Sequence, residues 1–515
     1  MVIVGVALVV GGLALRAAGW RAKPARARNV LLITMDTTRA DYLGCFGGVT
    51  AQTPNIDRLA REGTMFTRCT TCTPLTLPSH SSIMTGVYPY VHGARQNGTG
   101  HLAQSNVTLA ELLKKAGFAT AATVAAFVLN AQFGVDQGFD AYHDVTPAET
   151  DSSLHAERRG DEVCTDALQM LPQLAAGPHF FLWVHFYDPH YPYRSPRIAD
   201  VNSPNAYADE ISFTDTQIGR LVDKLKALGR ERDTLVVLVA DHGEGLGQHD
   251  ESTHGYLLYD TTVHAPLILY CPGIVPAGKR VAAQVRTIDV APTILDLTGN
   301  PASERAQGVS LRPLLADPPV DMHLTAYSES FDAQIEYGLS QLRSLSAGEW
   351  KYILAPKPEL YDVLADPGET HNLLAEQAMR AEELRGELHQ LIADAPAPPG
   401  KEEAPEPLTA REVERLKTLG YVNTPDAFVD EGVTELDRFE PHGGDPKDYV
   451  HYFQLLIRDL PELQAKQEYV KAEQLLLPLI EAMPQASRLY IHLAAVLGPQ
   501  GRTAHSPDGC FPASA

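Results

Sequence analysis

Residues 29–36, Asn-Val-Leu-Leu-Ile-Thr-Met-Asp, decide the fold class of this chain. The stretch before Asp36 is mostly apolar and rich in β-branched side chains, which is typical of a strand buried on both faces of a sheet. Similar strands are predicted at 180–186, 235–240 and 266–270, and helices at 108–116 and 210–228. Strands that alternate with helices predict an α/β domain with a mostly parallel central sheet flanked by helices.

Acidic residues stand at or just past the carboxyl ends of three predicted strands. They are Asp36, Asp188 and Asp241. In parallel sheets the functional groups gather beyond the carboxyl ends of the strands. We therefore expect one shared site at that edge of the sheet.

The residue types at this edge suit a metal ion. Asp36 and the Asp241-His242 pair offer two carboxylates and an imidazole, which suit Mn²⁺, Ca²⁺, Mg²⁺ or Zn²⁺. Thr76 precedes Pro78 and an apolar stretch, the pattern of a helix N-terminus and therefore of an anion site. A metal bound to this hydroxyl would activate it as a nucleophile. We predict that Asp36, Thr76, Asp241 and His242 bind one divalent metal ion.

Further motifs accompany these residues in a fixed order. They are Thr-Pro-Asn-Ile-Asp-Arg-Leu-Ala at 53–60, Thr85-Gly86, Asp-His-Gly-Glu at 241–244, Leu-Tyr-Asp at 258–260 and Glu-Leu-Tyr-Asp at 359–362. Each motif alone is more typical of an ordinary turn or helix cap. Their order resembles the sulfatase family of the alkaline-phosphatase superfamily. The resemblance covers about residues 29–375. It implies an alkaline-phosphatase-like sheet, a small C-terminal subdomain, and hydrolysis or transfer of an anionic ester.

The nucleophile segment departs from that family. Sulfatases carry Cys-x-Pro-x-Arg, whose cysteine becomes formylglycine, whereas this chain has Thr76, Pro78 and His80 at those positions. Threonine cannot become formylglycine, so the chain is more similar to the threonine-nucleophile phosphotransferases and phosphodiesterases of the superfamily, and a phosphoester is favoured. Cys72 in Cys-Thr-Pro offers a shifted alternative, but it lacks the arginine and lies one helical turn too early. Sulfate or phosphate, monoester or diester, and hydrolysis or transfer all stay open.

The resemblance also implies roles for histidines. Thr76 is expected to attack phosphorus or sulfur, with His80 orienting or activating it. His190 matches the family's Pro-His-x-Pro motif and His254 lies where sulfatases have a second lysine, so both are expected to stabilise the developing charge. His185, within a predicted strand, is interpreted as a core histidine.

Two other functions compete with this reading. In the first, Asp188, His190 and His254 bind a second metal ion about 4 Å from the first, which gives a two-metal phosphodiesterase. In the second, the domain is inactive and serves as a membrane-anchored scaffold whose C-terminal helices bind a protein partner. Intact Asp36 and Asp241-His242 argue against the scaffold.

Composition excludes some classes of function. The net charge of −22, with no basic stripe, argues against nucleic-acid binding. The six cysteines are too dispersed for a disulfide framework, and Cys69 and Cys72 have no second pair with which to bind zinc.

Both ends of the sequence carry distinct segments. Residues 1–22 form an apolar anchor or signal, which predicts membrane attachment of an extracytoplasmic domain, although the charges that follow it leave the orientation open. Residues 376–430 are predicted to be a helix and a Pro-rich linker. Residues 431–500 resemble a tetratricopeptide unit that could bind a protein partner, and 501–515 form a tail.

Overall fold

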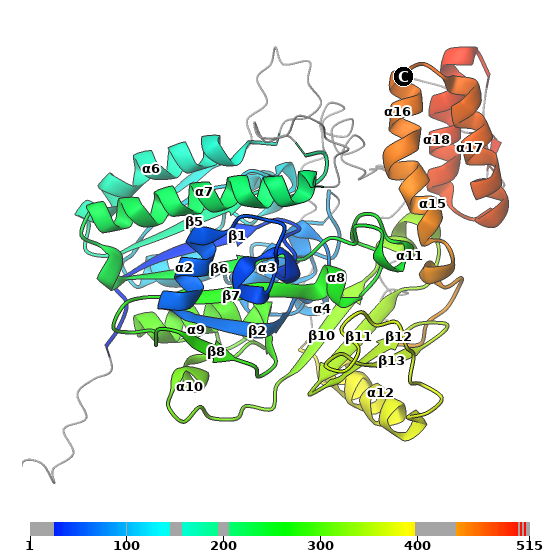
Figure 1. Ribbon diagram of the computed structural model, residues 1–515. Helices are drawn as coiled ribbons and strands as arrows, with labels where there is room; N and C mark the ends of the chain where they lie inside the picture. Colours follow the sequence, from blue (N-terminus) through cyan, green and yellow to red (C-terminus); the bar gives the residue numbers. More distant parts are fainter. Residues whose placement is uncertain are drawn as a thin grey trace, which may run out of the picture.

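Figure 1 shows the computed structural model of the chain, which describes residues 25–98, 100–144, 157–193, 205–396, 439–502, 505–506 and 509–510. The anchor or signal predicted at 1–22, most of the Pro-rich linker and most of the tail lie outside these residues. Within the described ranges, no helix combines the length and the apolarity needed to cross a bilayer. Membrane attachment stays a prediction.

One large sheet forms the centre of the molecule. In the described part of the chain it has nine strands, in the order β4-β3-β5-β1-β6-β7-β2-β8, with β9 paired to β2. The strands are β1 Asn29–Met35, β2 Thr64–Thr70, β3 Ala119–Thr123, β4 Ala141–His143, β5 Phe180–Phe186, β6 Thr234–Ala240, β7 His264–Tyr270, β8 Lys279–Val281 and β9 Val285–Arg286. All pairings are parallel except those of β7 with β6 and β2. The predicted α/β class and mostly parallel sheet are confirmed.

The three middle strands bring the candidate site together. Every residue of β5, β1 and β6 is buried, because apolar side chains pack against both faces of the sheet. The register pairs Met35 of β1 with Phe186 of β5 and with Ala240 of β6. All three strands therefore end at the same edge, and Asp36 and Asp241 follow directly on neighbouring strands.

Helices cover both faces of this sheet (Figure 1). Apolar residues of α2 Pro54–Glu62, α6 Gly160–Ala176 and α7 Ala206–Ala227 pack on one face. Those of α3 Thr76–Thr85, α5 Leu109–Lys115 and α9 Val290–Thr298 pack on the other. Thr108 begins α5 with a reciprocal hydrogen bond to Glu111, which satisfies two backbone N–H groups at the helix end.

A smaller antiparallel sheet follows the central one. Its strands are β10 Thr325–Ser330, β11 Leu342–Ala347, β12 Trp350–Leu354 and β13 Glu359–Asp362. The helix α12, Ala378–Ala393, buries Leu384 and Leu388 in the same apolar cluster as Tyr327 and Leu345 of this sheet. The small C-terminal subdomain implied by the family resemblance is therefore built from β10–β13 and α12.

A buried lysine joins the two sheets. Lys351 of β12 is fully buried, and its Nζ lies 2.8 Å from carboxylate oxygens of both Asp260 and Glu369. Asp260 belongs to α8, Asp260–Val263, directly before β7 of the central sheet. A buried charge needs such partners, so this cluster fixes the small sheet against the large one.

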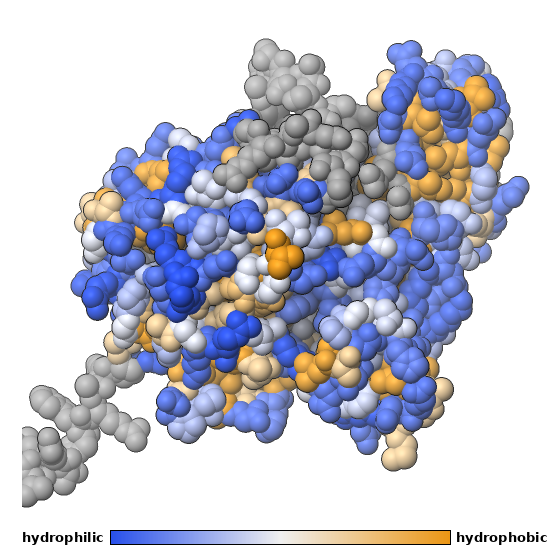
Figure 2. All heavy atoms as spheres, in the orientation of Figure 1, coloured by the Kyte–Doolittle hydropathy of each residue, from blue (hydrophilic) through white to orange (hydrophobic). Residues whose placement is uncertain are grey.

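Helices also form a C-terminal unit: α15 Val450–Gln454, α16 Leu460–Ala465, α17 Tyr469–Ala482 and α18 Ser487–Leu497. Figure 2 shows apolar surface on this unit, where Val470 and Leu477 of α17 are exposed. The structure confirms helices at the predicted positions. Their tetratricopeptide character and a protein partner for them stay predictions.

This helical unit packs against the rest of the described chain through aromatic rings and a buried ion pair. The ring of Phe453 stacks on Tyr256 at 4.1 Å and on Tyr337 at 4.6 Å. Arg488 of α18 forms an ion pair with Glu336 of α11, Asp332–Tyr337, and both side chains are buried. Tyr256 lies two residues after His254, so the helical unit supports the loop that carries this histidine.

Candidate active site

Asp36, Asp241 and His242 form the centre of the candidate site. All three side chains are fully buried, and one potential ligand atom from each lies within 4.8 Å of the others. Asp36 and Asp241 meet because β1 and β6 are neighbouring parallel strands that end in register. We refer to these three residues as the acidic triad.

Hydrogen bonds orient the acidic triad toward a common point. Asp241 Oδ1 accepts from the backbone N–H groups of Thr37 at 3.2 Å and His242 at 2.7 Å, which leaves Oδ2 without a partner among the described residues. Both carboxylate oxygens of Asp36 also lack one. His242 Nδ1 lies 3.0 Å from the carbonyl oxygen of Gly243 and donates to it, so its Nε2 keeps a lone pair.

The electrostatics of the acidic triad fit a divalent cation. Burial raises the pKa of Asp36 to about 6, and burial together with the neighbouring Asp36 raises the pKa of Asp241 well above its usual range. Two unpartnered carboxylates in a dry site are costly unless a cation balances their charge. Two hard oxygens and one imidazole nitrogen suit Mn²⁺, Mg²⁺, Ca²⁺ or Zn²⁺.

Thr76 lies beside the acidic triad. It is the first residue of α3, it is buried, and its Oγ1 lies 3.5 Å from His242 Nε2. The nearby hydroxyl also lowers the pKa of Asp36, against the larger raising effect of burial. The structure thus brings the four predicted metal ligands together. It also places the Thr76 hydroxyl at the positive end of a helix dipole, which favours an anion there.

His80 contacts the backbone carbonyl of Thr76 rather than its hydroxyl. Trp183 Nε1 donates to Thr34 Oγ1 at 2.9 Å, and Thr34 Oγ1 lies 3.0 Å from His80 Nε2. His80 Nδ1 lies 2.8 Å from the carbonyl oxygen of Thr76 and donates to it. Burial lowers the pKa of His80 well below its usual value, so the ring is neutral. This network holds the first turn of α3, and with it Thr76.

The substitution His80→Phe keeps the ring but removes both hydrogen bonds. We expect a loss of about 2–3 kcal/mol of unfolding free energy, because in this buried site the Thr34 hydroxyl loses its acceptor and the Thr76 carbonyl loses a donor. We also expect kcat to fall about 10-fold or more with KM nearly unchanged. Urea unfolding and steady-state kinetics test both. A large rise in KM at constant kcat would show instead that His80 contacts the substrate.

His190 and His254 lie next to the acidic triad. Their ring centroids are 5.0 Å apart, and that of His254 is 4.5 Å from the ring of His242. His190 Nδ1 donates to the carbonyl oxygen of Tyr191, and its Nε2 has no partner among the described residues. Burial lowers the pKa of both rings to about 4, so both are neutral at pH 7.

Two residues near the triad were missed by sequence reasoning. His185 Nε2 lies 3.4 Å from Asp36 Oδ2, so this buried strand histidine also contacts a predicted metal ligand. Glu244 Oε1 lies 3.2 Å from His254 Nδ1 and fixes that ring. A polar residue at the penultimate position of an otherwise apolar strand was the available signal for His185.

Other candidates lie apart from the acidic triad. Asp188 Oδ1 accepts from the N–H of Gly160 at 2.9 Å, so this carboxylate is held at the start of α6. The thiol of Cys72 is buried in the apolar cluster of the small sheet, and burial raises its pKa to about 12. Asp188 Oδ2 has no hydrogen-bond partner among the described residues, and the second metal site of the phosphodiesterase alternative stays a prediction. Cys72 is not among the three residues of the acidic triad.

Comparison with known proteins identifies the family. The sulfatase family model matches residues 28–300, and the model described as N-sulphoglucosamine sulphohydrolase, C-terminal, matches residues 252–396. The chain is similar to the uncharacterized sulfatase YidJ of Escherichia coli, with 25% identity over 71% of this chain and 86% of that protein.

Solved structures share the fold. The crystal structure of Ps i-CgsB in complex with k-i-k-neocarrahexaose has 20% identity and a TM-score of 0.63, and it covers 76% of this chain and 97% of that one. The phosphonate monoester hydrolase of Agrobacterium radiobacter has 23% identity and a TM-score of 0.60, covering 71% and 95%. With more than half of its residues matched by the family model, the chain belongs to the sulfatase family and is an ester hydrolase of that family.

Proposed function

We propose that this chain is a metal-dependent hydrolase in which Thr76 is the nucleophile and phosphorus esters are preferred over sulfate esters. The observation that carries the proposal is the place of the Thr76 hydroxyl. It stands at the N-terminus of α3, 3.5 Å from His242 Nε2 and beside Asp36. The position combines a nucleophile, a helix dipole and a set of metal ligands.

Asp36, Asp241, His242 and the Thr76 hydroxyl would hold the metal ion. When bound, the ion would supply Lewis-acid charge that favours the alkoxide form of Thr76 and balances the two carboxylates. Thr76 Oγ1 then loses its proton to the neutral ring of His190 or His254 and forms a bond to phosphorus. The bond from phosphorus to the leaving oxygen breaks, and the same ring passes the proton to the leaving alcohol. His80 keeps the first turn of α3 in place during this step.

The second step has to release Thr76 by attack of water. Threonine has one hydroxyl, so the esterified residue has no second hydroxyl that could expel the bound group. Water must therefore attack phosphorus in line and break its bond to Thr76 Oγ1. The neutral rings of His190 and His254 lie beside this position and can accept the proton of that water. A second alcohol in place of water would make the reaction a transfer.

The charges near Thr76 favour substrates with a single negative charge. The titratable groups that act on Asp36 are the imidazoles of His190 and His254, which burial keeps neutral at pH 7, rather than lysine or arginine. Neutral imidazoles hold a dianion less firmly than fixed cations do. Phosphodiesters, phosphonate monoesters and sulfate monoesters carry one charge, so this argument disfavours phosphate monoesters. The preference for phosphorus over sulfur rests on Thr76, which cannot become formylglycine, and a solved neighbour of this fold is a phosphonate monoester hydrolase.

Parallel assays test the proposal. The chain purified with Mn²⁺ is given an aryl sulfate, an aryl phosphate, a bis-aryl phosphate and an aryl phosphonate monoester. We expect the last two to have the highest kcat/KM, by about 10-fold or more, and Cys72→Ala to keep that activity. If aryl sulfate is the best substrate, the preference for phosphorus is wrong. If Cys72→Ala is inactive, the nucleophile has to be reassigned.

A further inference from the structure

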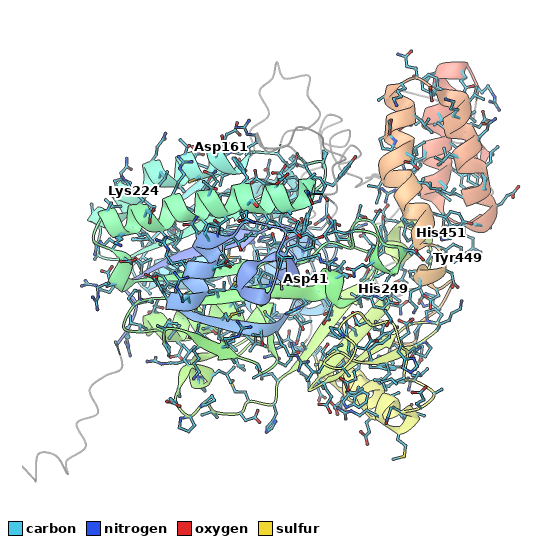
Figure 3. The ribbon with its side chains drawn as sticks, in the orientation of Figure 1. Asp41, Asp161, Lys224, His249, Tyr449 and His451 are labelled. Atoms are coloured by element: carbon cyan, nitrogen blue, oxygen red, sulfur yellow. The ribbon has the colours of Figure 1, made fainter. Side chains whose placement is uncertain are left out.

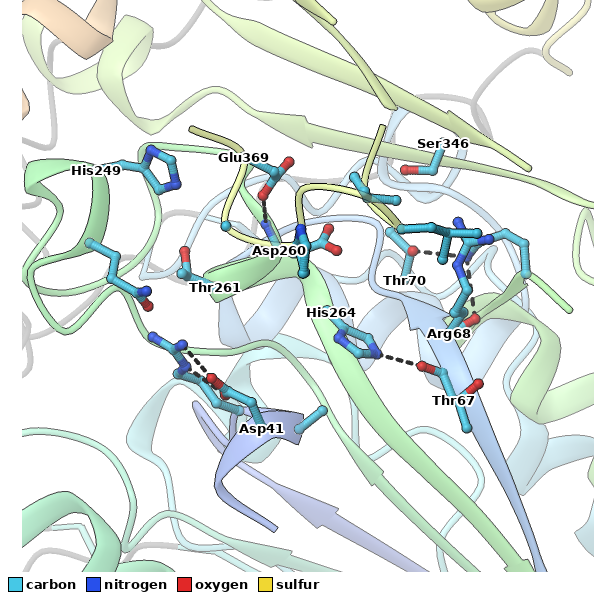
Figure 4. Close-up of a pocket in the computed structure, with 18 residues that line it drawn as sticks. Asp41, Thr67, Arg68, Thr70, His249, Asp260, Thr261, His264, Ser346 and Glu369 are labelled. Atoms are coloured by element: carbon cyan, nitrogen blue, oxygen red, sulfur yellow. Dashed lines mark hydrogen bonds and ion pairs between the residues drawn. The ribbon is translucent and has the colours of Figure 1, made fainter. Parts of the chain in front are cut away.

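A second pocket lies between the central sheet and the small subdomain (Figure 4). It has a volume of about 480 Å³, within the range of pockets that bind small molecules. Its walls come from β2, from the start of β7 and from the loop 363–369. Asp41 and His249, which line it, are marked in Figure 3.

This pocket lies near the acidic triad but is separate from it. Strand β2 runs parallel to β1 and β6, so Thr70 at its end lies at the same edge of the sheet as Asp36. Arg39 lines the pocket, and its guanidinium donates to the carbonyl oxygen of Glu244 at 3.2 Å. The segment 242–244 therefore stands between the two sites.

Arg68 is the distinctive residue of this pocket. Its side chain is partly buried in the pocket wall, and its guanidinium has no hydrogen bond or ion pair within the described residues. Partial burial lowers the pKa of Arg68, although the group stays charged at neutral pH. The carboxylates of Asp260, Glu349 and Asp362 attract this guanidinium through space but accept no hydrogen bond from it. Its shielded N–H groups therefore still lack acceptors in the described part of the chain, and a bound anion would supply them through two parallel hydrogen bonds.

The carboxylates that line the pocket already have close cationic partners. Asp41 pairs with Arg39 at 2.6 Å. Asp260 and Glu369 share Lys351, and burial raises the pKa of Glu369 to about 7, which reduces its negative charge. Arg68 is left as the cation through which this pocket can bind an anion.

The remaining walls suit a polar ligand with one apolar face. The hydroxyl-bearing residues Thr67, Thr261 and Ser346 line the pocket, and Val363, Leu364 and Pro367 form an apolar side. A sugar ring has this division between hydroxyl groups and C–H surface.

We propose that the pocket binds a sulfate or phosphate group carried by a molecule of about the size of a monosaccharide, with Arg68 holding the anionic group. The group is either a second charged substituent of the substrate or a free ligand. The proposal concerns a site beyond the acidic triad and does not depend on which residue is the nucleophile.

Equilibrium dialysis with radiolabelled inorganic sulfate tests the site without turnover. Asp36→Asn disrupts the acidic triad, so the sulfate that this variant still binds reports on the second pocket. Adding Arg68→Gln should weaken that binding about 10- to 100-fold. Adding Arg61→Gln, which removes an exposed guanidinium elsewhere, should leave it unchanged. Equal binding with and without Arg68→Gln, in variants that melt at the same temperature, would overturn the proposal.

Kinetics then separate the two sources of the anion. If the group belongs to the substrate, Arg68→Gln raises KM about 10-fold for a sugar ester with two charged groups and leaves a singly charged aryl ester unaffected. If the ligand is free, inorganic sulfate or a monosaccharide sulfate changes turnover of the aryl ester in the wild type and not in Arg68→Gln. If Arg68→Gln slows turnover of the singly charged aryl ester, and if sulfate and the monosaccharide sulfate leave turnover unchanged in the wild type, both explanations of the anion are wrong. A failed dialysis result leaves the role of Thr76 untouched, and an active Thr76→Ala leaves the pocket untouched.

Discussion

Replacement of Thr76 by alanine is expected to lower kcat by about 10³-fold or more on every ester that the wild type cleaves. The variant removes Oγ1, the atom that we propose as the nucleophile, while the acidic triad and the His80 network stay in place. Loss of a covalent nucleophile from a catalytic unit has effects of this size. Stability should change by only about 1 kcal/mol, because alanine is well accepted in the first turn of a helix.

A matched control comes from the same helix. Thr85 is also buried in α3, and its hydroxyl donates to the carbonyl oxygen of Ser81 at 2.7 Å, away from the triad. Thr85→Ala makes the same chemical change and should keep kcat within about threefold. Mass spectrometry of the wild type quenched during turnover should find the phosphoryl or sulfuryl group on Thr76. A fully active Thr76→Ala would show that the nucleophile lies elsewhere.

The second large effect is expected from Asp241→Asn. Asparagine keeps the shape of the side chain and can still accept from the N–H groups of Thr37 and His242, but it lacks the charge at Oδ2 that faces the metal position. We expect the affinity for Mn²⁺ to fall by at least about 100-fold, since even residues that only support metal ligands contribute 10- to 100-fold. Activity at limiting Mn²⁺ should fall in parallel.

Metal content and melting temperature check this without relying on activity. Mn²⁺ should raise the melting temperature of the wild type, because it binds the folded state, and should have little effect on Asp241→Asn. The metal-free variant should be at least as stable as the metal-free wild type, since one of two unpartnered buried charges is gone. Asp223→Asn on the surface is the control and should bind Mn²⁺ normally. Full metal occupancy in Asp241→Asn would remove Asp241 from the ligand set.

The sequence predicted the parts of the site that depend on strand ends. Asp36 and Asp241 could be placed together because two apolar runs each end in an aspartate, and neighbouring parallel strands end at one edge. Thr76 followed from the motif register. These positions depend on local patterns that survive in a single sequence.

Other features depend on packing between distant segments. The strand predicted at 266–270 is present as β7, but it runs antiparallel to its neighbours β6 and β2. Its direction could not be predicted, because an apolar run of residues does not show which way a strand will run in the sheet. His185 contacts Asp36 only because β5 pairs with β1 in this register. The pocket at Arg68 forms where the loop 363–369 meets β2. These two segments are nearly 300 residues apart in the chain, so no local sequence pattern predicts the pocket.

The interface of the C-terminal helices determines whether the catalytic domain can be produced without them. Phe453 packs against Tyr256 and Tyr337, and Arg488 pairs with Glu336. Tyr256 belongs to the loop that carries His254. A cut between the catalytic domain and the helices would leave those rings in water and the Glu336 carboxylate without its guanidinium. The helical unit is therefore part of the structure that holds the His254 loop, and we expect a catalytic domain severed from it to need that unit added back in trans to recover the native loop.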